Sequence, residues 1–209
     1  TTETLEFQRP KLRVRVTKYP KYACAGHAEC GLKQPPRGPG LVEGNRYGTC
    51  VAAEIITAKC AYYLPVYRQQ DWFAGSGWMP ARSTLLNIQA NAAYVLEPLY
   101  QHYVDLVRGA PVVPTDDTRV MLLLPAEIPA VREGDARSQR IHEVLSAARA
   151  AGKTHVQARF WAYRSLGPGG ANVFDFTVSR HRDGPQEFLK DYCGTLLGDC
   201  YSGYESIVL

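Results

Sequence analysis

Two aspartates each follow a short apolar run, although they lie far apart in the sequence. Asp116 follows residues 112–115 (VVPT), and Asp199 follows residues 195–198 (TLLG). Runs of this kind are typical of buried strands, and each strand would carry its carboxylate to a sheet edge. Two such strands lying side by side would bring the carboxylates together, and a hard cation such as Mg²⁺ would relieve their repulsion. The pattern predicts a two-metal phosphoryl-transfer site, with ordinary turn aspartates as the alternative.

The composition is that of an ordinary globular protein, with 209 residues and a formal net charge of +4. A chain of this length forms one large or two small domains. It has no apolar stretch near the ~20 residues that a membrane helix needs. Six cysteines do not make a disulfide framework at this size, and we expect Cys50 and Cys60 to fill a core. These features favour a cytoplasmic protein, and the missing Met suggests a piece of a longer one.

Positive charge is concentrated near the N-terminus. Residues 1–46 contain nine Lys and Arg against four Asp and Glu, whereas the remainder is nearly neutral. A basic arm attracts a phosphate backbone, although a solvated leader would have the same composition. Within the arm, the alternation at 12–16 (LRVRV) predicts a half-buried strand, and residues 33–46 are rich in Pro and Gly, as linkers are.

Residues 47–109 are predicted to form a small, all-helical region. Apolar residues recur there at three- and four-residue steps, which is typical of helices packed on one face. We expect helices at about 47–62, 65–74, 81–97 and 98–107, separated by prolines and glycines.

The two helices around the glycine turn at 75–77 predict a helix-turn-helix-like shape. The later helix opens with Arg82, Ser83 and Thr84, residue types that recognition helices present to phosphates and base edges. Arg68, before the turn, is a further candidate for DNA contact. Tight helix packing is the alternative for Arg68, and a three-helix region that binds no DNA would have the same pattern.

From residue 110 the pattern predicts an α/β domain. Strands are expected at 112–116, 120–124, 160–163, 173–178 and 195–199, and helices at 136–151 and 185–192. With the first of these helices set aside as an insertion, the order is an antiparallel meander, a crossover helix and a last strand. A right-handed crossover can place the last strand parallel to the first and beside it. Ribonuclease-H-like nucleases have this mixed sheet with flanking helices, and their first two catalytic acids lie where Asp116 and Asp199 are expected.

Eight segments carry a family resemblance. They are Lys21-Tyr22-Ala23-Cys24, Leu64-Pro65-Val66-Tyr67-Arg68-Gln69, Arg82-Ser83-Thr84-Leu85, Glu97-Pro98-Leu99, Asp116-Asp117-Thr118, Phe160-Trp161-Ala162-Tyr163, Phe176-Thr177-Val178-Ser179-Arg180 and Gly194-Thr195-Leu196-Leu197-Gly198-Asp199-Cys200-Tyr201. In this order they resemble segments of bacterial transposases of the insertion-sequence-sixty-six family. The resemblance implies a catalytic domain at 110–209, a DNA-binding region at 47–109, and a basic arm at 1–46 with the remnant of a zinc-binding region.

The resemblance also implies an activity, a cofactor and partners. The whole protein would be a DDE-type transposase that binds transposon ends and target DNA as a homo-oligomer. Asp116 and Asp199 would be its first two catalytic ligands for Mg²⁺ or Mn²⁺. The third, a downstream glutamate, would lie beyond Leu209, so we expect these 209 residues alone to be inactive. Glu205 lies too close to Asp199 to take that part, and we expect it on the surface.

The resemblance places a zinc-binding cysteine pair at Cys24, where the second cysteine is Cys30 and His27 lies between them. Two thiolates and one imidazole do not complete a tetrahedral structural site, so zinc is expected only in the full-length protein. Asp117 stands where the family has glutamate, and we expect it to have no metal-binding role.

Other readings of the chain stay open. One is a DNA-binding remnant without catalysis, and another is a different ribonuclease-H-like nuclease, such as a junction resolvase, that acts on branched DNA. Arg180 and Lys190 are candidates for phosphate contact, and ordinary surface charges are the alternative for both.

Overall fold

The computed structural model describes residues 11–23, 25–26, 31–36, 38, 40–44, 46–199, 201–205 and 207. The chain divides into two compact units, Thr1–Glu97 and Pro98–Leu209. The division falls inside one helix, α3 (Arg82–Arg108). Among the described helices, none has the length and apolar character to cross a membrane. The domain boundaries expected after residues 46 and 109 stay predictions.

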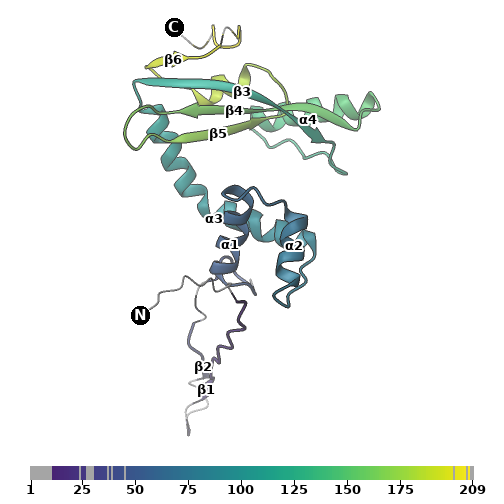
Figure 1. The fold of residues 1–209 in the computed structure, drawn as a ribbon, viewed down its shortest axis with the longest axis vertical. Helices are drawn as coiled ribbons and strands as arrows, with labels where there is room; N and C mark the ends of the chain where they lie inside the picture. Colours follow the sequence, from purple (N-terminus) through teal and green to yellow (C-terminus); the bar gives the residue numbers. More distant parts are fainter. Residues whose placement is uncertain are drawn as a thin grey trace, which may run out of the picture. The chain divides into compact units, whose positions relative to one another are not determined.

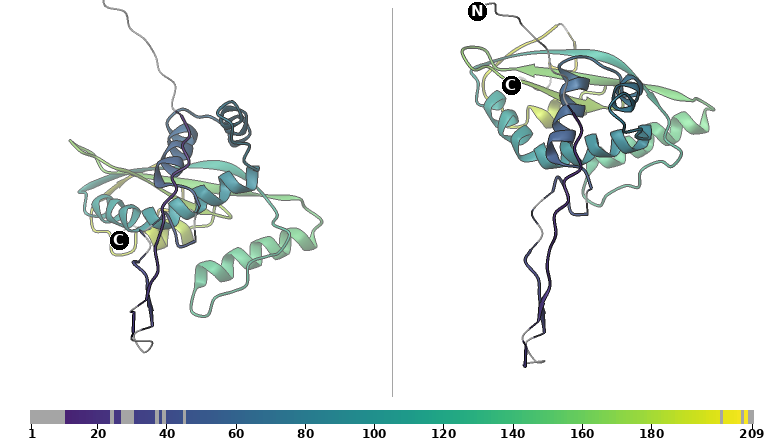
Figure 2. Two further views of the ribbon diagram at one scale, coloured as in Figure 1. Left: turned by 90° about the horizontal axis from the view of Figure 1, so that it is seen from below. Right: turned by 60° about the horizontal axis from the view of Figure 1, so that its bottom comes forward.

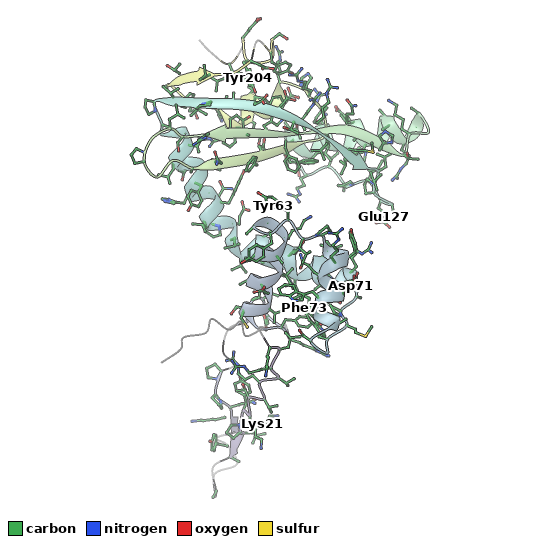
Figure 3. The ribbon with its side chains drawn as sticks, viewed as in Figure 1. Lys21, Tyr63, Asp71, Phe73, Glu127 and Tyr204 are labelled. Carbon is green, nitrogen blue, oxygen red and sulfur yellow. The ribbon has the colours of Figure 1, made fainter. Side chains whose placement is uncertain are left out.

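The first unit is mainly helical. It contains a short antiparallel pair, β1 (Tyr22–Ala23) and β2 (Leu32–Lys33), followed by α1 (Thr49–Cys60), α2 (Val66–Ala74) and the first part of α3. Its core consists of side chains from the three helices: Ala52, Ile55, Phe73, Leu85 and Ile88. Phe73 is labelled in Figure 3. This packing fits the expected three- and four-residue steps of an amphipathic helix.

Three expectations for the first unit and for α3 are wrong. Residues 12–16 form no strand, and Val14 and Val16 are 92% and 77% exposed, because alternation makes a strand only where a surface buries one side. Cys50 and Cys60 are exposed, since other residues fill the buried face of α1. Pro98 does not separate two helices: core packing on both sides of it, by Leu85 and Val107 among others, offsets the lost backbone hydrogen bond.

The second unit is built on a four-stranded mixed sheet. Its strands are β3 (Val112–Leu123), β4 (His155–Arg164), β5 (Asn172–Thr177) and β6 (Thr195–Leu197), and their order in the sheet is β5-β4-β3-β6. The first three form an antiparallel meander, and β6 lies parallel to β3 and beside it (Figure 1). The helix α4 (Ala136–Ala150) precedes β4, and α5 (Asp183–Phe188) precedes β6. This confirms the predicted α/β, ribonuclease-H-like sheet.

The expected strands at 112–116 and 120–124 are one continuous strand. Each residue of β3 from Thr115 to Leu123 pairs with a residue of β4, so the ladder runs through Asp116 and Asp117. The long partner strand β4 accounts for the continuity, because it offers hydrogen bonds along residues 117–119, where the sequence pattern predicted a break between two strands.

The helices α4 and α5 lie on the same side of the sheet (Figure 2). On this side Trp161 and Tyr163 are fully buried, and Val107 of α3 packs in the same cluster. Phe188 of α5 stacks on Tyr163, with ring centroids 3.8 Å apart and planes 6° from parallel. Strand alternation places Phe174 on the other side, where it is 58% exposed. The core that supports the sheet is therefore one-sided in the described residues.

We predict that Phe188→Ala destabilises the second unit by about 3–5 kcal/mol, because it removes a buried ring and leaves a cavity against Tyr163. The matched control is Phe174→Ala, which removes the same atoms from an exposed position and should cost much less. Urea denaturation followed by circular dichroism measures both variants. Equal losses would contradict the one-sided core.

Candidate metal centre

The pairing of β3 with β6 brings Asp116 and Asp199 to the same level of the sheet. The last parallel pair is Pro114 with Leu197, and each aspartate follows its strand residue by two positions. Oxygen atoms of Asp116, Asp117 and Asp199 all lie within 4.8 Å of one another. The two acids expected to meet do meet, and Asp117 joins them.

Asp116 and Asp199 are both exposed, and the side chain of Asp199 is 53% accessible. Carboxylate oxygens are hard donors, which Mg²⁺ and Mn²⁺ prefer. Exposure also leaves both carboxylates open to the solvent. The donor set therefore fits a divalent cation.

The third carboxylate differs from the other two. The Asp117 side chain is only 2% exposed, and two arginines surround it. Nε and Nη2 of Arg180 donate to Oδ1 at 3.0 and 2.8 Å. Nη1 of Arg159 lies 2.7 Å from Oδ2 in an ion pair without good hydrogen-bond geometry. The two arginines therefore already neutralise the charge of Asp117, and this carboxylate anchors the side chains of Arg159 and Arg180.

Arg180 connects the buried and exposed acids. Its Nη2 also lies 3.5 Å from Oδ2 of Asp199, and its guanidinium carbon lies 4.2 Å from the centroid of the Tyr201 ring. The hydrogen bond to Asp117 raises the pKa of Arg180 above its ordinary value, so the guanidinium keeps its charge. Arg180 is part of the site, because its ion pairs with Asp117 and Asp199 place it there, whereas Lys190 is exposed on the chain beyond α5.

Tyr204 packs against β3 and against the residue that follows β6. The hydroxyl of Tyr204, a residue labelled in Figure 3, lies 3.2 Å from Oγ1 of Thr115. Burial raises the pKa of Tyr204 to about 12, so its hydroxyl stays neutral. A Cβ at position 198 would lie 3.1 Å from the Tyr204 ring, a tight approach, so glycine allows this packing without a shift of the ring.

Glu205 is exposed, and the acidic cluster found among the described residues does not include it. Cys24 and Cys30 fall outside the described residues, so the zinc site stays a prediction.

The candidate DNA-contacting residues belong to the first unit. Arg68 is exposed, and its guanidinium lies 5.7 Å from the centroid of the Tyr67 ring. Arg82 and Ser83 are exposed in the first turn of α3, and Thr84 is half-buried. The start of a long helix with exposed Arg and Ser side chains is chemically suited to a phosphate.

We predict that Asp117→Asn lowers the free energy of unfolding by about 3–5 kcal/mol, because it leaves the buried Arg159 guanidinium without its partner. The matched change Asp116→Asn, one residue away on the exposed side, should not destabilise the protein. Thermal denaturation of both variants compares them. A stable Asp117→Asn protein would show that the two arginines do not depend on this carboxylate.

Comparisons with known proteins identify the family of the chain. Residues 44–209 match the family described as "Transposase IS66 family". The uncharacterized proteins y4jD and y4qI of Sinorhizobium fredii are 31% and 27% identical over 99% of this chain, which covers 37% and 34% of their lengths. The chain thus spans about a third of these curated relatives, and no solved structure matches it. The chain belongs to the IS66 family of transposases.

Proposed function

We propose that the whole protein is a DDE-type transposase that cuts insertion-sequence ends in double-stranded DNA and joins them to target DNA. The observation that carries the proposal is the meeting of Asp116 and Asp199 at one level of neighbouring parallel strands. Family membership supports transposition in general, and the donor set supports a divalent cation.

In this proposal Asp116 and Asp199 hold Mg²⁺ or Mn²⁺, and the chemistry is in-line displacement at phosphorus. The bound cation would supply Lewis-acid activation of water or a 3′-hydroxyl and stabilisation of the leaving oxygen. The strands β3 and β6 fix the spacing of the two acids, and no side chain acts as a nucleophile. Catalysis then depends on positioning and on charge.

The rest of the machinery is assigned by resemblance. A glutamate outside residues 1–209 would complete the ligand set, so this chain alone should be inactive. The basic residues of 1–46 and the exposed Arg68 and Arg82 would bind the DNA backbone. Assembly as a homo-oligomer on DNA would bring two transposon ends together.

We predict that Asp116→Asn and Asp199→Asn each abolish Mg²⁺-dependent cleavage and strand transfer by the full-length protein, because each removes a metal ligand. Glu205→Gln, at an exposed acid outside the cluster, is the control and should keep activity. Gel analysis of labelled transposon ends measures both steps. Activity that survives either aspartate change would reject the proposal, and DNA binding without any cleavage by the wild type would favour a non-catalytic remnant.

We predict that Arg82→Ala weakens binding to transposon ends without changing the fold, since Arg82 is exposed at the start of α3. If Arg82 contacts one phosphate, the slope of log affinity against log salt should shrink by about 0.9. Lys59→Ala, at an exposed lysine in the last turn of α1, is the charge-matched control. Unchanged affinity at matched salt would remove Arg82 from the interface.

A further inference from the structure

The charge balance of the site suggests a role for Arg180 that rests on the proposed metal-dependent function. Three carboxylates, Asp116, Asp117 and Asp199, lie together, and two guanidiniums, Arg159 and Arg180, contact them. The group therefore carries one net negative charge, although three acids alone would carry three. A divalent cation is attracted much less by such a site than by bare carboxylates.

The two arginines are held differently. Arg159 is buried, with its side chain 10% exposed, and among the described residues its ion pair is with Asp117. Arg180 is 38% exposed and has both a firm and a loose attachment. The firm attachment comprises two hydrogen bonds to Asp117 and the contact with Tyr201, whereas the loose one is the 3.5 Å ion pair with Asp199.

Only the loose contact involves a proposed metal ligand. An ion pair at 3.5 Å on an exposed side chain contributes little, so Asp199 can give it up at small cost. The remaining contacts would keep the guanidinium beside the site. The hydrogen bonds of Arg180 to Asp117 use Nε and Nη2, and Nη2 also makes the contact with Asp199, so loss of the Asp199 pair leaves both hydrogen bonds to Asp117 in place.

We propose that Arg180 is a tethered counter-cation: it pairs with Asp199 when no metal is bound, and a divalent cation must displace it from that carboxylate. It is a positioning residue, because it acts through Asp199. It keeps Asp199 beside Asp117 before metal arrives, and its positive charge lowers the affinity of the site for metal.

Manganese binding to these 209 residues, measured from the electron paramagnetic resonance signal of free Mn²⁺, tests the proposal. Removing one positive charge beside the ligands by Arg180→Gln should tighten binding by about tenfold at constant salt. Arg180→Lys keeps the charge and should stay within about twofold of the wild type. Arg182→Gln, which removes an equal charge two residues away, is the matched control, and circular dichroism checks the fold.

The outcomes separate this inference from the proposed function. If Asp199→Asn removes Mn²⁺ binding but Arg180→Gln binds like the wild type or more weakly, the metal site stands and the counter-cation is rejected. An equal gain for Arg182→Gln would also reject it, because any nearby charge would then suffice. If neither Asp116→Asn nor Asp199→Asn changes Mn²⁺ binding, the metal site itself fails, and the inference fails with it.

A measurement on the wild type covers the case in which Arg180→Gln does not fold. Titration with Mg²⁺ should shift the Nε–H resonance of Arg180 with the same midpoint as metal binding, because the guanidinium loses Asp199 and keeps Asp117. A resonance that stays unchanged through saturation would overturn the proposal.

Discussion

The parallel pairing of β3 with β6 is the constraint on which the site depends. It sets Pro114 beside Leu197, and each aspartate follows two positions later in the chain. A slip of one residue in this ladder would send one carboxylate to the opposite side of the sheet. The packing of Tyr204 against Gly198 and Thr115 stabilises the register of β3 with β6. The site is thus a consequence of sheet topology: Asp116 lies within β3, and Asp199 lies two residues beyond the end of β6.

The charge balance among the carboxylates and arginines is the second constraint on the site. Three carboxylates within 4.8 Å would repel one another strongly, yet the buried one is neutralised by Arg159 and Arg180. The two exposed acids, Asp116 and Asp199, keep contact with water, which screens their charges. The neighbours Asp116 and Asp117 therefore have different roles: the carboxylate of Asp116 is available to a ligand, and that of Asp117 holds the two arginines in place.

The sequence was sufficient for the sheet order and for the meeting of Asp116 with Asp199, because each apolar run ends at its acid and a crossover connection has a fixed hand. It was not sufficient for the arginine network. Arg159 alternates in phase with the buried Trp161 and Tyr163, a signal for a buried, paired charge that was overlooked. The unity of β3 and the continuity of α3 through Pro98 depend on tertiary partners, which local patterns do not report.

The most direct test of the account is a crystal structure of the protein grown with Mn²⁺, examined by anomalous diffraction. The account predicts an anomalous peak between the carboxylates of Asp116 and Asp199, with oxygen distances of about 2.0–2.3 Å. It also predicts that Asp117 remains between Arg159 and Arg180 in the same crystal. Absence of a peak at saturating Mn²⁺, or a structure in which the Asp116 and Asp199 carboxylates lie too far apart to share a cation, would contradict it.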